Sequence, residues 1–319
     1  MGSGSYTART FVDYSIKKGL DYDTTTKKFA DNIMHQDIFK SRTIDKDLDP
    51  WGVEYRECKD STEHPCTKPV ILALDVTGSM GQAATEVASS LGVIMENLYK
   101  KVTDIQFMTM GIGDFAYDKF PLQVSQFESD IRINEQLDKI YFEFGGGGNT
   151  YESYTAAWKF ALDHTAIDAV EKKRCKPPII TIGDEKINPF INKSRWYSKT
   201  CHELQADIDT NELYKQVSEK FSLYHIHVSH GNIRGYYDND CVQSFADVIG
   251  PQHVFTTTVN EIDQVITNII LDCYKEEEKP VETKTPIVSS DPIPVAFEDT
   301  TEEEKPTGIQ KDENGYICW

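Results

Sequence analysis

Three side chains that carry oxygen follow an apolar run in the first third of the chain. Asp75, Thr77 and Ser79 come directly after Val70–Leu74 and before Gly81, where a helical pattern begins. An unbroken apolar run is typical of a strand buried on both faces of a parallel sheet. A carboxylate and two hydroxyls at alternate positions of a turn can point at one centre, and oxygen-only ligand sets suit Mg²⁺ better than zinc or copper. The alternative is that the hydroxyls only cap the following helix, and this segment alone leaves both interpretations open.

Acidic residues also follow two further apolar runs. The runs 105–112 and 178–182 each lead through a glycine into a carboxylate, and four consecutive glycines at 145–148 precede another helical pattern. Ligands bind outside the carboxyl ends of the strands in an open parallel sheet, so we expect these segments to meet the first one at the same edge. The additional candidates from these three segments are Asp114, Asn149, Thr150, Asp184 and Glu185.

The elements that must position these residues alternate between strand and helix patterns across residues 68–274. This alternation predicts an α/β fold with a doubly wound, mostly parallel sheet that has helices on both faces. The third strand is short and follows Pro121, which indicates an edge position. The expected strands are 70–74, 105–112, 122–127, 178–182, 222–228 and 253–257, and the expected helices are 84–98, 131–140, 154–162, 213–221, 241–249 and 259–274.

The segments on either side of this domain differ from it in composition. Residues 1–67 are polar and weakly periodic, which predicts an irregular N-terminal arm with one short helix near Thr25–Gln36. Residues 275–319 are rich in Glu, Lys, Pro and Thr and have too few apolar side chains to fold alone, which predicts a disordered acidic C-terminal tail. The apolar residues in its last five positions, Gly315–Trp319, suggest a short docking motif as a hypothesis.

The composition excludes several classes of partner. A formal net charge of −19 argues against nucleic acid, because phosphate binding needs clustered Lys and Arg, and against anionic membrane surfaces. No apolar run approaches the length of a membrane span, and the N-terminus lacks the apolar core of a signal peptide, so we expect a cytoplasmic protein. Seven cysteines without a Cys-x-x-Cys pair predict reduced thiols. Cys58, His64 and Cys66 offer three of the four ligands that a structural zinc needs, which is a weak signal.

Taken together, the motifs resemble the von Willebrand factor A (VWA) domain with its metal-ion-dependent adhesion site. Its signature is Asp-x-Ser-x-Ser after the first strand, a Thr in a second loop and an Asp after the fourth strand. Here the first part is the segment 75–79, in which Thr77 replaces the first Ser and keeps its hydroxyl. Thr150 and Asp184 match the other two parts. Four short sequence segments also resemble an intracellular bacterial or phage-like branch of the family, at residues 111–114, 121–124, 126–130 and 181–185.

The resemblance implies a Rossmann-like VWA fold over residues 68–274 and a Mg²⁺ ion, with Mn²⁺ or Ca²⁺ as alternatives. The open position of the metal would accept a carboxylate from an Asp or Glu of a protein partner, such as a MoxR-type AAA+ ATPase. In the second loop, Asn149 or Thr155 are alternatives to Thr150. The metal ligands implied by the resemblance are Asp75, Thr77, Ser79, Thr150 and Asp184, and the residues implied beside them or in contact with the bound partner are Gly78, Asp114, Asn149 and Glu185.

Other activities fit the sequence less well. A Mg²⁺ ion with Asp114 and Glu185 nearby could activate water, so a metal-assisted hydrolase acting on phosphoesters is the main alternative. The glycine run lacks the Lys-Ser or Lys-Thr of a phosphate-binding loop. His225 and His227 alternate on one strand, with His230 just beyond, and we interpret them as structural rather than as metal ligands. The sequence therefore predicts a binding module rather than an enzyme.

Overall fold

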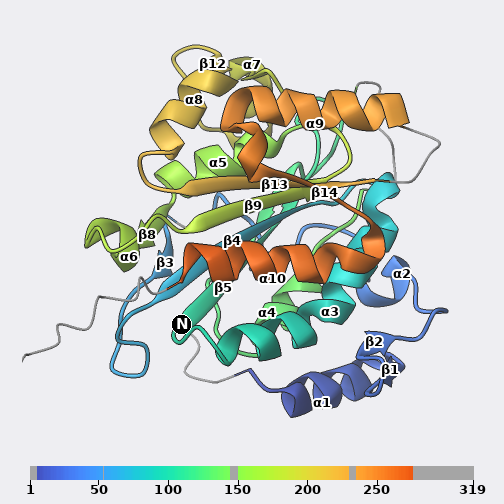
Figure 1. Ribbon diagram of the computed structural model, residues 1–319. Helices are drawn as coiled ribbons and strands as arrows, with labels where there is room; N and C mark the ends of the chain where they lie inside the picture. The colour runs from blue at the N-terminus through green and yellow to red at the C-terminus, as the bar shows by residue number, and fades with distance from the viewer. Residues whose placement is uncertain (1–5, 53, 144–149, 230–234, 276–319) are drawn as a thin grey trace, which may run out of the picture. The chain divides into compact units, whose positions relative to one another are not determined.

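The centre of the molecule is a six-stranded sheet (Figure 1). The computed structural model describes residues 6–275 except for 53, 144–149 and 230–234. Neighbouring strands pair in parallel except at one edge, where β6 is antiparallel to β5. In spatial order the strands are β14 (Val254–Thr257), β13 (Ser222–Val228), β9 (Pro178–Gly183), β4 (Lys68–Asp75), β5 (Ile105–Ile112) and β6 (Leu122–Val124).

Helices cover both faces of this sheet (Figure 1). On one face lie α3 (Gly81–Tyr99), α4 (Arg132–Leu137) and α10 (Ile262–Cys273), and on the other lie α5 (Tyr154–Asp163), α8 (Thr210–Val217) and α9 (Gly235–Ile249). The side chains of β4 alternate between the two cores, with Leu72 and Leu74 in one and Ile71 and Ala73 in the other. Burial on both faces explains why residues 70–74 of this strand are all apolar. The predicted mixed α/β fold with a central, mostly parallel sheet is confirmed.

The edge strand β6 ends three residues earlier than the sequence predicts. The hydroxyl of Ser125 accepts a hydrogen bond from the Thr109 backbone N–H at 2.8 Å, so a side chain takes the place of the next backbone partner. A single bridge between Phe107 and Glu128 resumes the pairing further on. The predicted edge position is confirmed.

The N-terminal arm is more regular than the sequence predicts. It contains α1 (Ala8–Lys18), β1 (Tyr22–Asp23), β2 (Lys28–Phe29), α2 (His35–Ile38) and β3 (Arg56–Cys58). The expected helix at 25–36 is wrong, because the Asp23 carboxylate accepts hydrogen bonds from the backbone N–H groups of Thr25 and Thr26 and forms a turn there. The longer helix lies earlier, where Thr7 caps its first turn and Gly19, with φ of 71°, ends it.

The arm packs directly on the domain. Phe11 is 1% exposed and lies against Gly92 of α3, where an added Cβ would come within 2.9 Å of its ring. Residues near the end of the arm cover the free edge of β6. The buried Arg56 donates to the Val124 carbonyl at 2.9 Å, and the Val124 N–H donates to the Leu48 carbonyl at 2.8 Å. The exposed hydrogen-bonding groups of an edge strand are therefore satisfied within the chain.

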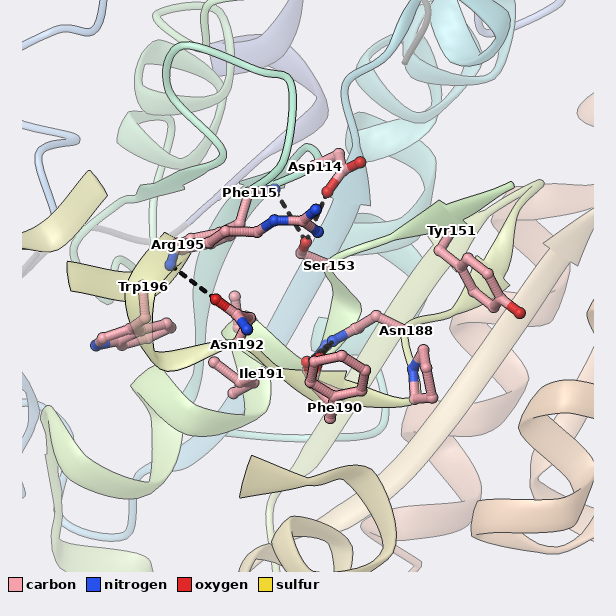
Figure 2. A pocket seen from close by; sticks show the side chains of 13 residues that line it. Asp114, Phe115, Tyr151, Ser153, Asn188, Phe190, Ile191, Asn192, Arg195 and Trp196 are labelled. Carbon is pink, nitrogen blue, oxygen red and sulfur yellow. Dashed lines mark hydrogen bonds between the residues drawn. The ribbon is translucent and has the colours of Figure 1, made fainter. Parts of the chain in front are cut away.

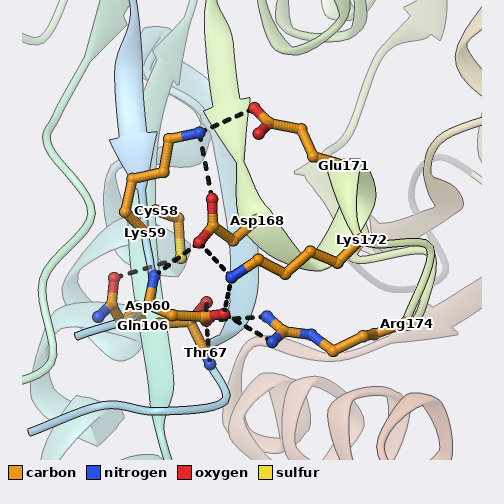
Figure 3. A network of polar contacts seen from close by, with 9 residues as sticks. All are labelled: Cys58, Lys59, Asp60, Thr67, Gln106, Asp168, Glu171, Lys172 and Arg174. Atoms are coloured by element: carbon orange, nitrogen blue, oxygen red, sulfur yellow. Dashed lines mark hydrogen bonds and ion pairs between the residues drawn. The ribbon is translucent and has the colours of Figure 1, made fainter. Parts of the chain in front are cut away.

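A polar network ties the end of the arm to the segment after α5 (Figure 3). Strand β3 pairs with β8 (Thr165–Ile167), and α6 (Asp168–Glu171) follows it. The Asp60 carboxylate accepts two hydrogen bonds from the Arg174 guanidinium, at 2.7 and 2.9 Å, and one from Lys172 at 2.6 Å. These cations hold the pKa of Asp60 well below its usual range.

A long connection lies between β9 and β13. It contains β10 (Lys186–Ile187), β11 (Phe190–Ile191), α7 (Lys193–Thr200) and β12 (Ile208–Asp209). In the described ranges, no helix combines the length and the apolar character that a membrane crossing requires. Residues 276–319, with the predicted disordered tail and docking motif, lie outside the described part of the chain.

Candidate metal centre

The two aspartates predicted as ligands end neighbouring strands. Leu74 of β4 is paired with Ile182 of β9, so Asp75 and Asp184 leave the sheet side by side. Strand β4 is followed along the chain by β5 on one side, whereas β9 lies on its other side. The two carboxylates therefore flank the switch point, where parallel sheets usually bind ligands. Both residues are 0% exposed.

The hydroxyls of the first turn reach both carboxylates. The backbone N–H and the side-chain hydroxyl of Thr77 donate to Oδ1 of Asp75 at 2.9 and 2.7 Å. The Ser79 hydroxyl donates to Oδ1 of Asp184 at 3.1 Å. Gly78 and Ser79 lie in a single 3₁₀ turn that leads into α3. Four of the five predicted ligands thus form one connected set.

The fifth predicted ligand is less closely connected. Thr150 is exposed, and its backbone carbonyl accepts a hydrogen bond from Lys186 N–H at 3.3 Å. Among the described residues, the Thr150 hydroxyl forms no hydrogen bond with the other four predicted ligands. The alternative Thr155 is buried, and its hydroxyl accepts from the Asn188 side chain instead. Asn149, together with the glycine run before it, lies outside the described residues.

Sequence reasoning missed two residues that lie at this centre, Glu152 and Tyr154. Strand β7 (Tyr151–Glu152) pairs with β10, which begins two residues after Asp184. The Tyr154 hydroxyl donates to Oδ2 of Asp75 at 3.1 Å. A Cβ at Gly183 would lie 1.8 Å from that hydroxyl, so only glycine leaves room for the contact. The available signal was the spacing of Glu152 and Tyr154 at alternate positions after the glycine run.

The centre is strongly acidic and buried. Burial, followed by the charge of Asp184, raises the pKa of Asp75 to about 7. Burial also raises the pKa of Glu152, and the nearby charges of Asp75 and Asp118 add to the effect. Oε2 of Glu152 is buried without a hydrogen-bond partner in the described part of the chain. A buried carboxylate oxygen without a partner is costly unless a cation or proton compensates it.

The other predicted residues lie at the margin of the centre. The Asp114 carboxylate accepts from Ala116 N–H at 2.8 Å, and its own N–H donates to Asp118 at 2.6 Å. Burial raises the pKa of Asp118 to about 6. The Glu185 carboxylate accepts a hydrogen bond from the Tyr237 hydroxyl of α9. Asp114 and Glu185 are therefore held by their own neighbours rather than by the four connected ligands.

These residues fit a hard cation. Two adjacent buried carboxylates and two hydroxyls provide oxygen ligands only, which suits Mg²⁺. Across residues 6–275, apart from the gaps already given, no group of three or more His, Cys, Asp or Glu side chains is placed to hold a metal. The candidate set is consistent with this result because it has two carboxylates, and it assigns Glu152 an electrostatic role rather than a ligand position.

The two other candidate metal sites, at His225 and at Cys58 and His64, consist of side chains that contact their protein neighbours. His225 is fully buried, its ring stacks on Phe245 with centroids 3.4 Å apart, and Nδ1 lies 2.9 Å from the Thr181 hydroxyl. Burial lowers the pKa of His225 well below its usual value. His64 lies 3.4 Å from Asp104, and the Cys58 thiol donates to the Gln106 side chain at 3.2 Å. His230 lies outside the described residues.

The chain is similar to known proteins only in a comparison with solved structures. No protein-family model matches the chain, and no curated protein matches it. The pilus adhesin SpaC from Lactobacillus rhamnosus GG, in an open conformation, is 12% identical with a TM-score of 0.43, and the match covers 67% of this chain and 30% of that one. The vWF domain of the type V pili tip protein Mfa5 from Porphyromonas gingivalis is 12% identical with a TM-score of 0.42, and the match covers 65% of this chain and 94% of that one.

Proposed function

We propose that this protein is a metal-dependent protein-interaction module of the VWA type. A divalent cation, preferably Mg²⁺, is held by the four connected ligands together with Thr150, and it binds a carboxylate of a protein partner. The observation that carries the proposal is the pairing of Thr77 with Asp75 and of Ser79 with Asp184, which places two hydroxyls on the buried negative charge of two adjacent carboxylates. Such charge is stable at neutral pH when a cation neutralises it.

The protein groups have distinct roles in this proposal. Asp75 and Asp184 supply the negative charge, and the neutral hydroxyls of Thr77 and Ser79 add ligands without adding charge. The bound metal supplies an electrophilic position for a partner carboxylate. Tyr154 fixes the orientation of Asp75 through Oδ2. Burial raises the pKa of Glu152, so its carboxyl group is protonated in the metal-free protein and adds negative charge only when a bound cation lowers that pKa.

A direct test measures Mg²⁺ binding to the full chain by calorimetry. We expect binding in the wild-type protein, a large loss in Asp184→Asn, and a smaller loss in Ser79→Ala, which removes one exposed hydroxyl and no core contact. Asp13→Asn is the matched control, because Asp13 is an exposed acid of α1. Equal affinity in all four proteins would refute the proposed ligand set.

A second test concerns the partner. Capture of a MoxR-type AAA+ ATPase, the partner that the family resemblance implies, is expected in Mg²⁺ and not in chelator or with Asp184→Asn. The same experiment distinguishes the binding module from the hydrolase alternative. Turnover of a phosphoester that requires Asp75 would favour an enzyme, whereas metal-dependent capture without turnover favours the module.

A further inference from the structure

A cavity of about 200 Å³, whose lining side chains are drawn in Figure 2, shares a wall with the candidate metal centre. The shared wall is the segment 151–155. Glu152 and Tyr154 belong to the metal centre, whereas Tyr151, Ser153 and Thr155 line the cavity. The opposite wall begins at Asn188, four residues after Asp184. A partner segment bound at the metal would therefore lie next to this cavity.

The floor of the cavity is apolar and made of buried side chains. The rings of Phe115 and Trp196 stack with centroids 5.2 Å apart and an angle of 5° between their planes. Both are buried, as are Ala156 and Ile191. An apolar cavity of roughly 150 Å³ is large enough to hold benzene. This cavity therefore has room for one large apolar side chain.

The mouth of the cavity carries two exposed aromatic rings and one cation. Tyr151 and Phe190 are 38% and 45% exposed. Arg195 of α7 is also exposed, and Figure 2 shows it extending toward Asp114 and Ser153. The guanidinium forms no hydrogen bond or ion pair with any residue in the described ranges. Tyrosine, tryptophan and arginine are the residue types most enriched where binding energy concentrates in protein interfaces.

Asp114 and the Arg195 guanidinium form no hydrogen bond or ion pair with each other among the described residues, although Figure 2 shows the two side chains close together. Its Oδ1 is engaged by Ala116 N–H at 2.8 Å and lies 3.4 Å from the Ser153 hydroxyl. The guanidinium remains available to a carboxylate from outside, which it can bind through two parallel hydrogen bonds. The chemistry of the cavity thus combines an apolar floor with a cation at its mouth.

We propose that this cavity binds a partner segment that places a large apolar side chain on Phe115 and Trp196 and a carboxylate on Arg195, adjacent to the carboxylate that the metal binds. The occupant is an acidic peptide with an apolar residue, argued from the charge of Arg195, the apolar lining and the wall shared with the metal centre. The part of this proposal that places the peptide next to a metal-bound carboxylate rests on the proposed function. The cavity itself binds its ligand without metal.

The test uses 3-phenylpropanoate, which joins a phenyl ring to a carboxylate, and the neutral 3-phenylpropanamide as its matched probe. Both are titrated in chelator into the full chain, and the methyl resonances of Ile191 and Ala156 are followed by NMR. We expect saturable shifts with millimolar affinity for the acid. Arg195→Gln should lower the affinity for the acid about tenfold and leave the affinity for the amide unchanged, because only the acid makes a charge-assisted hydrogen bond. Phe190→Ala should weaken both probes.

The control is Tyr197→Ala, an exposed aromatic residue of the same helix that does not line the cavity. The proposal would be overturned if neither probe shifts the methyl resonances, or if Arg195→Gln lowers the affinity for the acid and for the amide equally. Tighter probe binding after Trp319→Ser would show that the C-terminal residues of this chain fill the cavity, and would overturn the assignment to a partner. Because the titration contains no metal, a failure of Mg²⁺ binding leaves it intact, and its own failure leaves the metal centre untouched.

Discussion

Asp75 couples the proposed metal centre to the stability of the fold. Its carboxylate is fully buried, and burial together with Asp184 raises its pKa from 3.8 to about 7. The substitution Asp75→Asn keeps the shape and the acceptor oxygen that Thr77 uses while removing the charge. Without metal, we therefore expect the variant to be more stable than the wild-type protein at pH 8.

The magnitude follows from the difference in pKa. One pKa unit corresponds to about 1.4 kcal/mol, so charging Asp75 in the folded state costs about 4 kcal/mol. The pKa of Asp75 is higher in the folded state than in the unfolded state, so protonated Asp75 favours the folded protein. This contribution to the free energy of unfolding is complete below the unfolded pKa of 3.8 and is lost as the pH rises through about 7. Between pH 5.5 and 8.5 the free energy of unfolding should fall by about 2 kcal/mol through this residue.

The assay is urea unfolding followed by tryptophan fluorescence, in chelator and in excess Mg²⁺, across pH 5.5–8.5. In chelator, the stability difference between Asp75→Asn and the wild-type protein should grow with pH. Mg²⁺ should stabilise the wild-type protein at pH 8 and leave the variant unchanged, because only a folded binding site gains from the ligand. A variant that is less stable than wild type by the same amount at every pH would refute the reasoning.

Three further predictions concern packing and charge elsewhere. Phe11→Ala should lower the free energy of unfolding by about 3–5 kcal/mol in urea titrations, whereas Ile16→Ala on the exposed side of the same helix should change it little, and equal effects would contradict the docking of the arm. Gly183→Ala should displace the Tyr154 hydroxyl and weaken Mg²⁺ binding measured by calorimetry, and unchanged affinity would dismiss that contact. Asp60→Asn should lower the free energy of unfolding by about 1.5–3 kcal/mol at pH 7, because the lowered pKa of Asp60 contributes stability that is present above pH 3.8 and lost as the pH falls. An equal loss in urea titrations at pH 3 would contradict this origin.

Local patterns were sufficient for the six strands of the central sheet and the helices that cover its two faces. The strand at 105–112 has its predicted bounds, and the edge position of β6 followed from Pro121. The start of α9 lies at 235 rather than 241, because its first turns are polar and carry no apolar stripe. The arm was predicted poorly because the burial of its apolar side chains depends on distant segments, as for Phe11 against Gly92 of α3 and Phe39 against Phe142.

The sequence by itself determined that Asp75 and Asp184 lie at the same edge of the sheet, because apolar runs predict buried parallel strands whose carboxyl ends share one edge. Only the tertiary structure decided which side chains surround them. Tyr154 contacts Asp75 across 79 positions of sequence, and the cavity beside them is lined from three separate segments. Periodicity reports which face of an element is buried, whereas such contacts depend on how distant elements pack, which no local pattern contains.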